Sequence, residues 1–530
     1  MKLRLDFFHH KARFGVTAVL LLLIAACAMI RHDHPRPPPS YAFSQPELTT
    51  LGRAYVDIQA KHPGESGFRL LNNGPSALLT RAAMSDLAER SIDVQSYIYD
   101  ADEVGVFLLE RLIAAADRGV RVRMLLDDHE LGLDDEALAL INAHPNIEVR
   151  TFNPFPDRAR WSRVLQLLSQ ISHLGKRMHN KVFAVDGQVA ILGGRNIANL
   201  YFEGKGDANF RDFDLLGSGP VVKEVDAHFD AYWNSPIAVP VTAYPARAGD
   251  RKLAEYIKEL KLEVSDGYGP NAEYQNRKVE FERRLLQGQS ELIWAKSRAI
   301  AEPPIRQKPG ETKSSSEIAR ALLSARQQTT HEMIIVSAYF VPSERGVDML
   351  ADLVKRGIRV RVLTNSLAST DVVAVHSGYL RYRVPLIEAG VELHEYRPDS
   401  PRPAQPNQVM RLGASRSGLH AKAIIFDRRL VWIGSANFDP RSRRINTEDG
   451  YLIESEALAA RVIETMERDF TGENSWRLSV ATDPQTEQKR LNWHALKDGK
   501  EMRVDREPGV GFLRQFKVFL FSLLLPEELL

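Results

Sequence analysis

The chain contains two copies of one sequence pattern, and this repeat limits the possible folds more than any other feature. Residues 118–125 read Arg-Gly-Val-Arg-Val-Arg-Met-Leu, and residues 356–363 read Arg-Gly-Ile-Arg-Val-Arg-Val-Leu. Further along, His-Asn-Lys at 179–181 returns as His-Ala-Lys at 420–422, in the same order and with nearly the same separation. Repetition of a whole unit predicts two lobes of common ancestry. The length of 530 residues also favours two lobes over one core.

Each copy has the pattern of alternating strands and helices. An apolar, β-branched run is followed by a helical stretch that ends at a glycine, Gly119 or Gly357, and then by a second short strand. These stretches are residues 92–98, 104–117 and 120–126 in the first copy, and 333–340, 347–355 and 358–364 in the second. Strand, helix and strand in this order predict a βαβ crossover and a parallel component in the sheet. We therefore expect an α/β fold of two pseudo-symmetric lobes, each an α-β-α sandwich with a mixed sheet.

The segments outside the repeats differ from them in composition. Residues 241–310 are charged and partly helical, and they separate lobe 1, at 46–240, from lobe 2, at 311–480. The C-terminal segment, 481–530, begins as a polar stretch and ends in an apolar tail with helical spacing. The tail carries Phe512, Leu513, Phe516, Phe519, Leu520 and Leu523, with Arg514 and Lys517 between them. Two interpretations stay open for this helix: it lies in a membrane interface, or it docks on the protein core.

The N-terminus predicts export to the cell envelope. Basic residues at 2–13 precede an uncharged apolar run at 14–30, which is typical of a signal peptide or signal anchor. The run is at the lower limit for a spanning helix. It contains Ile-Ala-Ala-Cys at 24–27, which resembles a lipoprotein cleavage box with Cys27 lipidated; alternatively, Cys27 is one more small residue of an anchor helix. A proline-rich tether follows at 31–45, and the positive-inside rule places the rest on the non-cytoplasmic side.

The charge and the cysteine content narrow the classes of partner. The chain has 70 basic and 68 acidic residues, a net charge of +2, whereas a sequence-blind nucleic-acid binder normally has a large basic excess. The single cysteine excludes an intramolecular disulfide and a metal site built on several thiolates. We therefore expect neither a nucleic-acid partner nor a metal or other cofactor.

Two matching motifs carry the chemistry. Residues 179–186 have the pattern His-x-Lys-x4-Asp and are followed by Gly-Gly-Arg-Asn at 193–196. Residues 420–427 repeat that pattern and are followed by Gly-Ser-Ala-Asn at 434–437. With these motifs the chain resembles the phospholipase D superfamily, and within it the bacterial cardiolipin synthases, most of all the group called type C. The stretches 92–99, 337–342, 364–367, 375–379 and 437–442 are similar to the same family.

The spacing of each motif brings its reactive side chains to one side of the chain. On a strand, alternate side chains share a face, so His179 and Lys181 point the same way, and the second pair does likewise. If the lobes pack about a pseudo-twofold axis, both pairs meet in one pocket. There the two lysines, with the amides of Asn196 and Asn437, would stabilise the charge of a phosphodiester without a metal.

The resemblance implies a phosphohistidine mechanism. One histidine attacks phosphorus and the other protonates the leaving oxygen; by resemblance the nucleophile is His179 and the acid is His420. Each histidine needs an acidic partner that sets its tautomer. The resemblance implies Glu448 in the second copy and Asp212, with Asp214 as the alternative, in the first.

The lysines and aspartates complete the catalytic signature. They are Lys181, Asp186, Lys422 and Asp427. Because the two aspartates fall at predicted hairpin turns, 186–187 and 427–428, a structural role is the expectation for them.

The resemblance also implies a substrate class. Enzymes of this family transfer a phosphatidyl group to phosphatidylglycerol and make cardiolipin, with glycerol or ethanolamine released from a phosphatidylglycerol or phosphatidylethanolamine donor. The export signal departs from the family pattern, so a periplasmic phospholipase D that hydrolyses lipids is the alternative. A phosphodiesterase or nuclease is a third interpretation, which the membrane-directed N-terminus and near-neutral charge disfavour. We expect phospholipids and a membrane surface as partners, and a monomer suffices because one chain holds both motifs.

Overall fold

The computed structural model describes most of the chain beyond the N-terminal segment. The described residues are 37–156, 175–203, 208–244, 249, 251–264, 272–286, 291–305, 316–400, 416–482 and 487–527. The predicted anchor at 1–30, its Cys27 and the first part of the tether lie outside these residues. Among the described helices, none combines the length and the apolar character needed to cross a bilayer.

The first lobe is built on one mixed β-sheet. Its elements are η1 (Pro46–Leu48), α2 (Thr50–Ala60), β1 (Ser66–Leu71), α3 (Gly74–Leu87), β2 (Ser91–Tyr99), α4 (Glu103–Asp117), β3 (Arg121–Leu131), α5 (Asp135–Asn142), β4 (Ile147–Phe152), β5 (Val182–Val185), β6 (Val189–Gly193), η3 (Asn199–Tyr201), β7 (Ala208–Arg211), β8 (Asp214–Ser218), α8 (Pro220–Trp233), β9 (Ala238–Pro240) and η4 (Val241–Ala243). The strand order is β1–β8–β6–β5–β2–β3–β4–β9, in which β2, β3 and β4 run parallel. Helix α4 makes the predicted crossover from β2 to β3.

The second lobe repeats this arrangement. Its elements are α11 (Glu317–Gln328), β11 (Glu332–Ser337), α12 (Ser343–Lys355), β12 (Arg359–Asn365), α13 (Val373–Leu380), α14 (Arg383–Glu388), β13 (Glu392–Tyr396), β14 (Arg416–Leu419), β15 (Lys422–Phe426), β16 (Leu430–Gly434), α15 (Pro440–Arg444), β17 (Asp449–Glu454), α16 (Glu456–Glu467) and β18 (Ser475–Thr482). The order β17–β16–β15–β11–β12–β13–β18 matches the part β8–β6–β5–β2–β3–β4–β9 of the first lobe, with β11, β12 and β13 parallel. The predicted fold of two pseudo-symmetric α/β lobes is confirmed.

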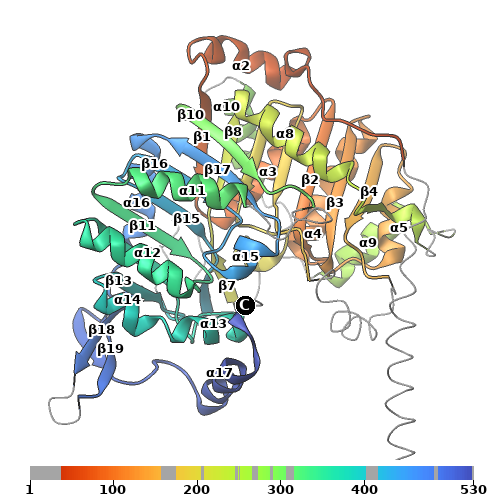
Figure 1. Ribbon diagram of the computed structural model, residues 1–530. Helices are drawn as coiled ribbons and strands as arrows, with labels where there is room; N and C mark the ends of the chain where they lie inside the picture. The colour runs from red at the N-terminus through yellow and green to blue at the C-terminus, as the bar shows by residue number, and fades with distance from the viewer. Residues whose placement is uncertain are drawn as a thin grey trace, which may run out of the picture.

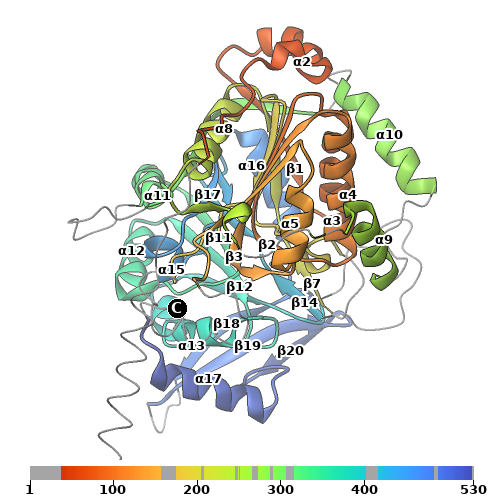
Figure 2. The ribbon, with the colours of Figure 1, turned by 90° about the vertical axis from the view of Figure 1, so that its right-hand side faces the viewer.

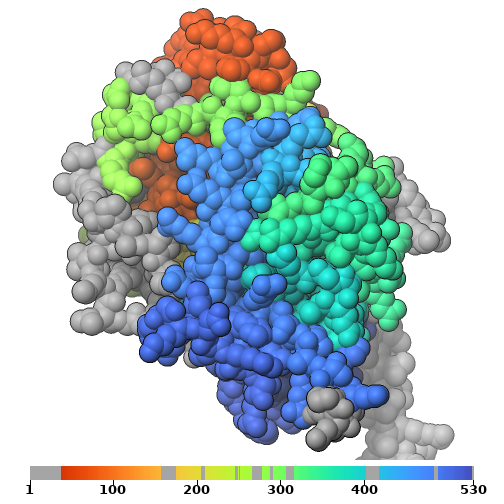
Figure 3. All heavy atoms as spheres, turned by 90° about the vertical axis from the view of Figure 1, so that its left-hand side faces the viewer, coloured from red at the N-terminus to blue at the C-terminus, as the bar shows by residue number. Residues whose placement is uncertain are grey.

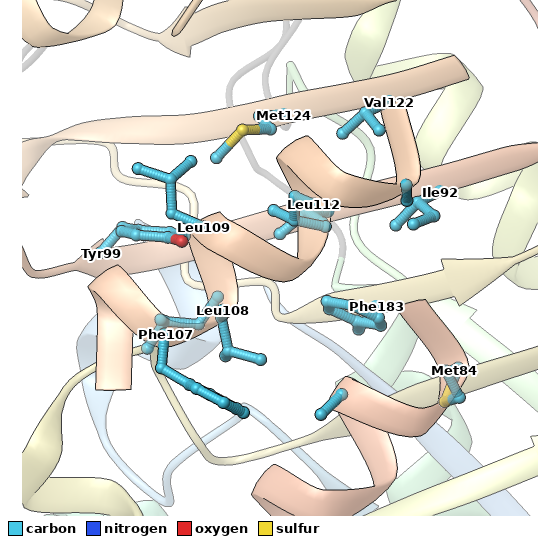
Figure 4. Packing of buried hydrophobic residues seen from close by; sticks show 14 of the residues in the cluster. Met84, Ile92, Tyr99, Phe107, Leu108, Leu109, Leu112, Val122, Met124 and Phe183 are labelled. Atoms are coloured by element: carbon cyan, nitrogen blue, oxygen red, sulfur yellow. The ribbon is translucent and has the colours of Figure 1, made fainter. Parts of the chain in front are cut away.

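Local signals in the sequence account for these elements, and α4 is an example. It begins after Asp102, whose side chain accepts a hydrogen bond from the N–H of Gly105. The chain leaves the helix at Gly119, which takes a φ of +93° that favours glycine. Between these ends, apolar residues recur at helical spacing, and Leu109 and Leu112 turn toward β3 in the buried core (Figure 4).

The inter-lobe segment contributes the strand that joins the two sheets. It contains α9 (Leu253–Glu263), α10 (Ala272–Leu286) and β10 (Ile293–Ala301). One part of β10 pairs antiparallel with β1 of the first lobe, and the rest pairs antiparallel with β17 of the second (Figure 1). The sheets are therefore continuous, which holds the two motifs in a defined relation.

The C-terminal segment extends the second lobe. The polar stretch there forms β19 (Lys489–Lys497) and β20 (Lys500–Val504), which add antiparallel strands beside β18. The C-terminal segment, dark blue in Figure 3, lies at the lower end of the molecule on that face. Helix α17 (Phe512–Leu524) follows and lies against α13 (Figure 2).

Candidate active site

The two motifs meet because each lobe hydrogen-bonds to the chain at the other lobe's histidine. The N–H of His179 donates to the carbonyl of Thr447 at 2.9 Å, and the N–H of His420 donates to the carbonyl of Arg211 at 2.8 Å. In addition, β14 pairs in parallel with β7, a cross-lobe ladder that ends one residue before His420. Both histidines are buried, immediately ahead of β5 and β15.

Each histidine contacts a carboxylate from the opposite lobe. His179 Nδ1 lies 2.7 Å from Glu448 Oε2, and His420 Nδ1 lies 2.6 Å from Asp212 Oδ2. The alternative residue, Asp214, is turned away into a buried ion pair with Arg81 at 3.0 Å. Sequence spacing could not show this exchange between lobes, because it depends on how the two sheets are joined.

Two serines fix the carboxylate beside His179. Ser435 Oγ donates to Glu448 Oε2 at 2.5 Å, and Ser442 Oγ donates to Oε1 at 2.8 Å. Burial alone would raise the pKa of Glu448, but the neighbouring His179 and Lys181 bring that pKa below its usual value. An ionised carboxylate only accepts hydrogen bonds, so His179 Nδ1 carries the proton and Nε2 keeps its lone pair. The sequence analysis did not single out these serines, although Ser435 belongs to the Gly-Ser-x-Asn motif.

The second histidine has a different set of contacts. Lys422 Nζ lies 2.8 Å from His420 Nδ1, the same atom that faces Asp212. Both lysines also donate to a main-chain carbonyl, Lys181 to that of His179 at 2.6 Å and Lys422 to that of His420, so only the approach of Lys422 to the ring nitrogen distinguishes the two halves. The two halves of the site are therefore not chemically equivalent.

Burial controls the protonation of these groups. It lowers the pKa of His179 to about 4, an effect that Glu448 opposes, and together with Lys422 it brings the pKa of His420 well below its usual value. Burial also lowers the pKa of Lys181 to about 7 and that of Lys422 to about 8. The charge of Lys422 acts on His179 and that of Lys181 acts on His420, so the four groups form one cluster.

Aromatic rings surround both histidines. The ring of Tyr97 meets His179 edge-on with centroids 5.1 Å apart, and that of Tyr201 meets His420 in the same way at 5.0 Å. Phe210 stacks on His420 at 5.1 Å. The sequence analysis missed these residues because they lie outside the motifs.

The remaining motif residues divide into two groups. Asn196 Oδ1 accepts a hydrogen bond from the N–H of Ile98, and Asn437 Oδ1 is buried with no partner among the described residues. The carboxylate of Asp186 accepts from three backbone N–H groups at residues 89–91, and that of Asp427 accepts from those at residues 330–332. Each aspartate ties its hairpin turn to the start of the neighbouring paired strand, β2 or β11, and no contact joins them to the histidines in the described part of the chain.

No metal site accompanies this cluster in the described residues. Groups of three or more His, Cys, Asp or Glu side chains placed to hold an ion do not occur among them.

A family model described as "Cardiolipin synthase, PLD-like domain" matches two stretches of the chain. They are residues 83–233 and 321–470. Each stretch contains one His-x-Lys-x4-Asp motif, and together they coincide with the repeated lobes.

The chain is similar to several bacterial proteins over most of its length. It is 37% identical to cardiolipin synthase C of Escherichia coli K12 over 487 residues, which are 91% of this chain and 100% of that protein. An uncharacterized protein of Helicobacter pylori is 32% identical over 91% of this chain and 93% of its own length. Cardiolipin synthase B of Escherichia coli K12 is 24% identical over 73% of this chain and 76% of its own length. The solved structure of a Haemophilus influenzae phosphatidylserine synthase shares the fold, with a TM-score of 0.53 at 13% identity. The match covers 91% of this chain and 100% of the synthase chain.

Proposed function

We propose that this chain, which belongs to the phospholipase D-like cardiolipin synthase family, carries its phosphatidyl group on His179 between donor and acceptor lipids. Family membership makes the chain a phosphatidyltransferase of the phospholipase D superfamily that acts on phospholipids. The observation that supports the finer mechanism is the pairing of each histidine with a carboxylate of the other lobe.

In the first step, His179 Nε2 attacks the phosphorus of the donor lipid. Glu448 accepts a hydrogen bond from Nδ1–H and stabilises the positive charge that develops on the ring. A P–N bond forms, the P–O bond to the donor head group breaks, and His420 gives a proton to the leaving oxygen. The ammonium groups of Lys181 and Lys422, with Asn196 and Asn437, stabilise the phosphoryl oxygens.

In the second step, the acceptor hydroxyl replaces the histidine. His420, now neutral, takes the proton of that hydroxyl as its oxygen attacks phosphorus. The new P–O bond forms, the P–N bond breaks and His179 returns to its starting state. Water in place of the alcohol would give hydrolysis through the same residues.

The carboxylates beside the two histidines support these roles. Glu448 keeps the proton of His179 on Nδ1, which leaves Nε2 free to attack. At His420, Asp212 accepts a hydrogen bond from Nδ1 in the same way, so the acid carries a proton on both ring nitrogens and gives the one on Nε2 to the leaving oxygen. The arriving phosphodiester anion also raises the pKa of His420 and so helps it act as an acid.

The proposal extends to substrates, assembly and location. The proposed acceptor is phosphatidylglycerol and the proposed donor is phosphatidylglycerol or phosphatidylethanolamine, because a glycerol head group offers the free hydroxyl that the second step needs. One chain supplies both histidines, so we infer that the monomer is active. The N-terminal pattern at 2–30 supports a membrane-attached protein whose lobes lie on the periplasmic side, either as an anchored protein or as a lipoprotein through Cys27.

The lipid profile of cells that lack cardiolipin tests the reaction. We expect cardiolipin to appear when they express this chain, because both steps then have their substrates, and to remain absent with His179→Ala. Mass spectrometry of total lipids measures both. Phosphatidic acid without cardiolipin would mean that the enzyme hydrolyses lipids, and unchanged lipids would contradict a phospholipid substrate.

We expect kcat/KM to fall as the pH rises through about 7 to 8. Lys181 and Lys422, with pKa values of about 7 and about 8, are charged below those values and neutral above them, so phosphate binding is lost on the alkaline side. On the acid side, burial lowers the pKa of His179 to about 4, so it keeps its lone pair down to about pH 5. A pH profile of kcat/KM with a phosphatidylglycerol donor measures this, and a flat profile from pH 6 to 9 would contradict it.

A further inference from the structure

Helix α17 exposes an apolar face that no other described part of the chain covers. Val518 is its one buried residue, at 3% exposure, whereas Phe512 is 83% exposed. The exposed large apolar side chains of this helix are Phe512, Leu513, Phe516, Phe519, Leu520, Leu523 and Leu524. At about 100° per residue they fall within one arc of about 140°, and Arg514 and Val518 lie outside it on the opposite side.

The opposite face fastens α17 to the second lobe. Arg514 Nε donates to the carbonyl of Leu367 at 2.7 Å, and its Nη2 donates to the carbonyl of Thr370. The segment ahead of the helix is held as well, because the carboxylate of Glu507 binds the buried guanidinium of Arg383 at 2.8 and 2.9 Å. The helix thus docks on the protein by the side that carries Arg514 and Val518, and it presents its broad apolar side outward. The docked interpretation applies to the first side, and the membrane interpretation stays a prediction for the second.

The segment beneath α17 leads directly to the active site. It begins at Asn365, whose Oδ1 accepts from the N–H of Leu419 at 2.9 Å and whose Nδ2 donates to the carbonyl of Leu419 at 2.7 Å. Leu419 immediately precedes His420. At the other end of the segment, the charge of Asp371 partly offsets the lowering of the pKa of Lys422. The apolar face of α17 therefore has a fixed relation to one half of the site.

Positive charge borders this face. Lys517 is exposed at the edge of the apolar arc. Just beyond the end of α17, Glu527 forms an ion pair with Arg381 at 3.5 Å, and the same carboxylate acts on the pKa of Arg443 of α15. Apolar side chains rimmed by lysine and arginine fit the acyl layer and anionic head groups of a phospholipid membrane.

We propose that α17 lies in the interface of an anionic phospholipid bilayer, with its apolar face in the acyl layer, and that this docking holds the His420 half of the site at the lipid head groups. The occupant is a bilayer because the family's substrates are bilayer lipids, and α17 offers them a preformed apolar surface beside the chemistry. The inference rests on the phospholipid activity and does not depend on which histidine is phosphorylated.

Quenching of a new tryptophan by brominated lipid chains tests the position of α17. Full-length Phe516→Trp is mixed with phosphatidylglycerol vesicles that carry brominated acyl chains, and Leu262→Trp on α9, an exposed position at 78%, is the matched control. We expect the emission of the tryptophan introduced at position 516 to fall about twofold or more, and the emission of the tryptophan introduced at position 262 to stay unchanged. Equal quenching at the two positions would overturn the proposal, as would a lipid-free dimer that shields residue 516 and persists with vesicles.

A kinetic comparison tests the role of docking. The triple variant Phe512→Ser/Phe519→Ser/Leu523→Ser should lose about tenfold or more in rate on vesicles and keep its rate on short-chain phospholipid dispersed in detergent. Leu262→Ser/Val279→Ser, which removes exposed apolar residues of α9 and α10, should change neither rate. An unchanged vesicle rate, or equal loss on both substrates, would overturn the proposal. Quenching at 516 in a His179→Ala background separates docking from catalysis, because that protein should bind vesicles without turnover.

Discussion

The His179→Ala variant is expected to lose phosphatidyl transfer by about a thousandfold or more, because alanine cannot form the P–N bond. His420→Ala should lose turnover to a similar extent on natural lipids, whose leaving oxygen needs a proton. The two variants should differ with a donor lipid that carries a nitrophenol leaving group, which departs without acid help. With that donor, His420→Ala should release close to one equivalent of nitrophenol per enzyme, and His179→Ala should release none.

Covalent labelling makes the comparison decisive. His420→Ala that is quenched with denaturant at neutral pH should carry an acid-labile phosphatidyl group on the peptide that contains His179, detected by mass spectrometry. Label on the peptide with His420 would reverse the assigned roles, and full turnover by either variant would exclude a single composite site. Asp427→Asn is a useful control, because this aspartate ties the hairpin turn at 427–428 to the backbone N–H groups of residues 330–332 and makes no described contact with the histidines.

Glu448→Gln is expected to lower kcat by roughly a hundred- to ten-thousandfold with a much smaller change in KM. The 2.7 Å contact to His179 Nδ1 holds the productive tautomer and stabilises the imidazolium, and an amide supplies neither the charge nor a fixed acceptor. Because Ser435 and Ser442 both donate to this carboxylate, the amide also disturbs its orientation. Steady-state kinetics on dispersed lipid measure the effect.

The matched control is Glu454→Gln. Glu454 ends the same strand, β17, and pairs with Arg429 where both side chains are about half exposed, so the same substitution there should change kcat little. Thermal unfolding of both variants separates a loss of orientation from a loss of fold. A Glu448→Gln enzyme with nearly normal kcat would contradict the positioning role.

Much of the fold can be predicted from local patterns. The strand–helix–strand order of each copy, the glycine exits at Gly119 and Gly357, and the hairpin turns depend on residues close together in the chain, so their propensities decide them. The repeat then implies two similar lobes. By contrast, the residues of β10 do not indicate which strands it pairs with. The strands β19 and β20 could not be predicted either, because the composition of their segment shows only that it is polar.

The candidate reactive residues could also be predicted from the sequence. The spacing of His179, Lys181 and Asn196, repeated in the second copy, indicates phosphodiester chemistry because those side chains are the ones such chemistry needs. The positions of Tyr97 and Phe210 beside the histidines could not be predicted from the sequence, because aromatic side chains occur throughout ordinary protein cores.

The sequence by itself therefore determined the family, the repeated architecture and the histidine pairs, because each depends on short-range patterns present twice. The tertiary structure alone decided that Glu448 serves His179 and Asp212 serves His420, since β10 and the β7–β14 ladder set the lobes against each other over hundreds of residues of chain. The tertiary structure also decided which face of α17 is exposed to solvent. Periodicity gives the two faces of a helix, but only the contacts of Arg514 and Val518 show which one the protein covers.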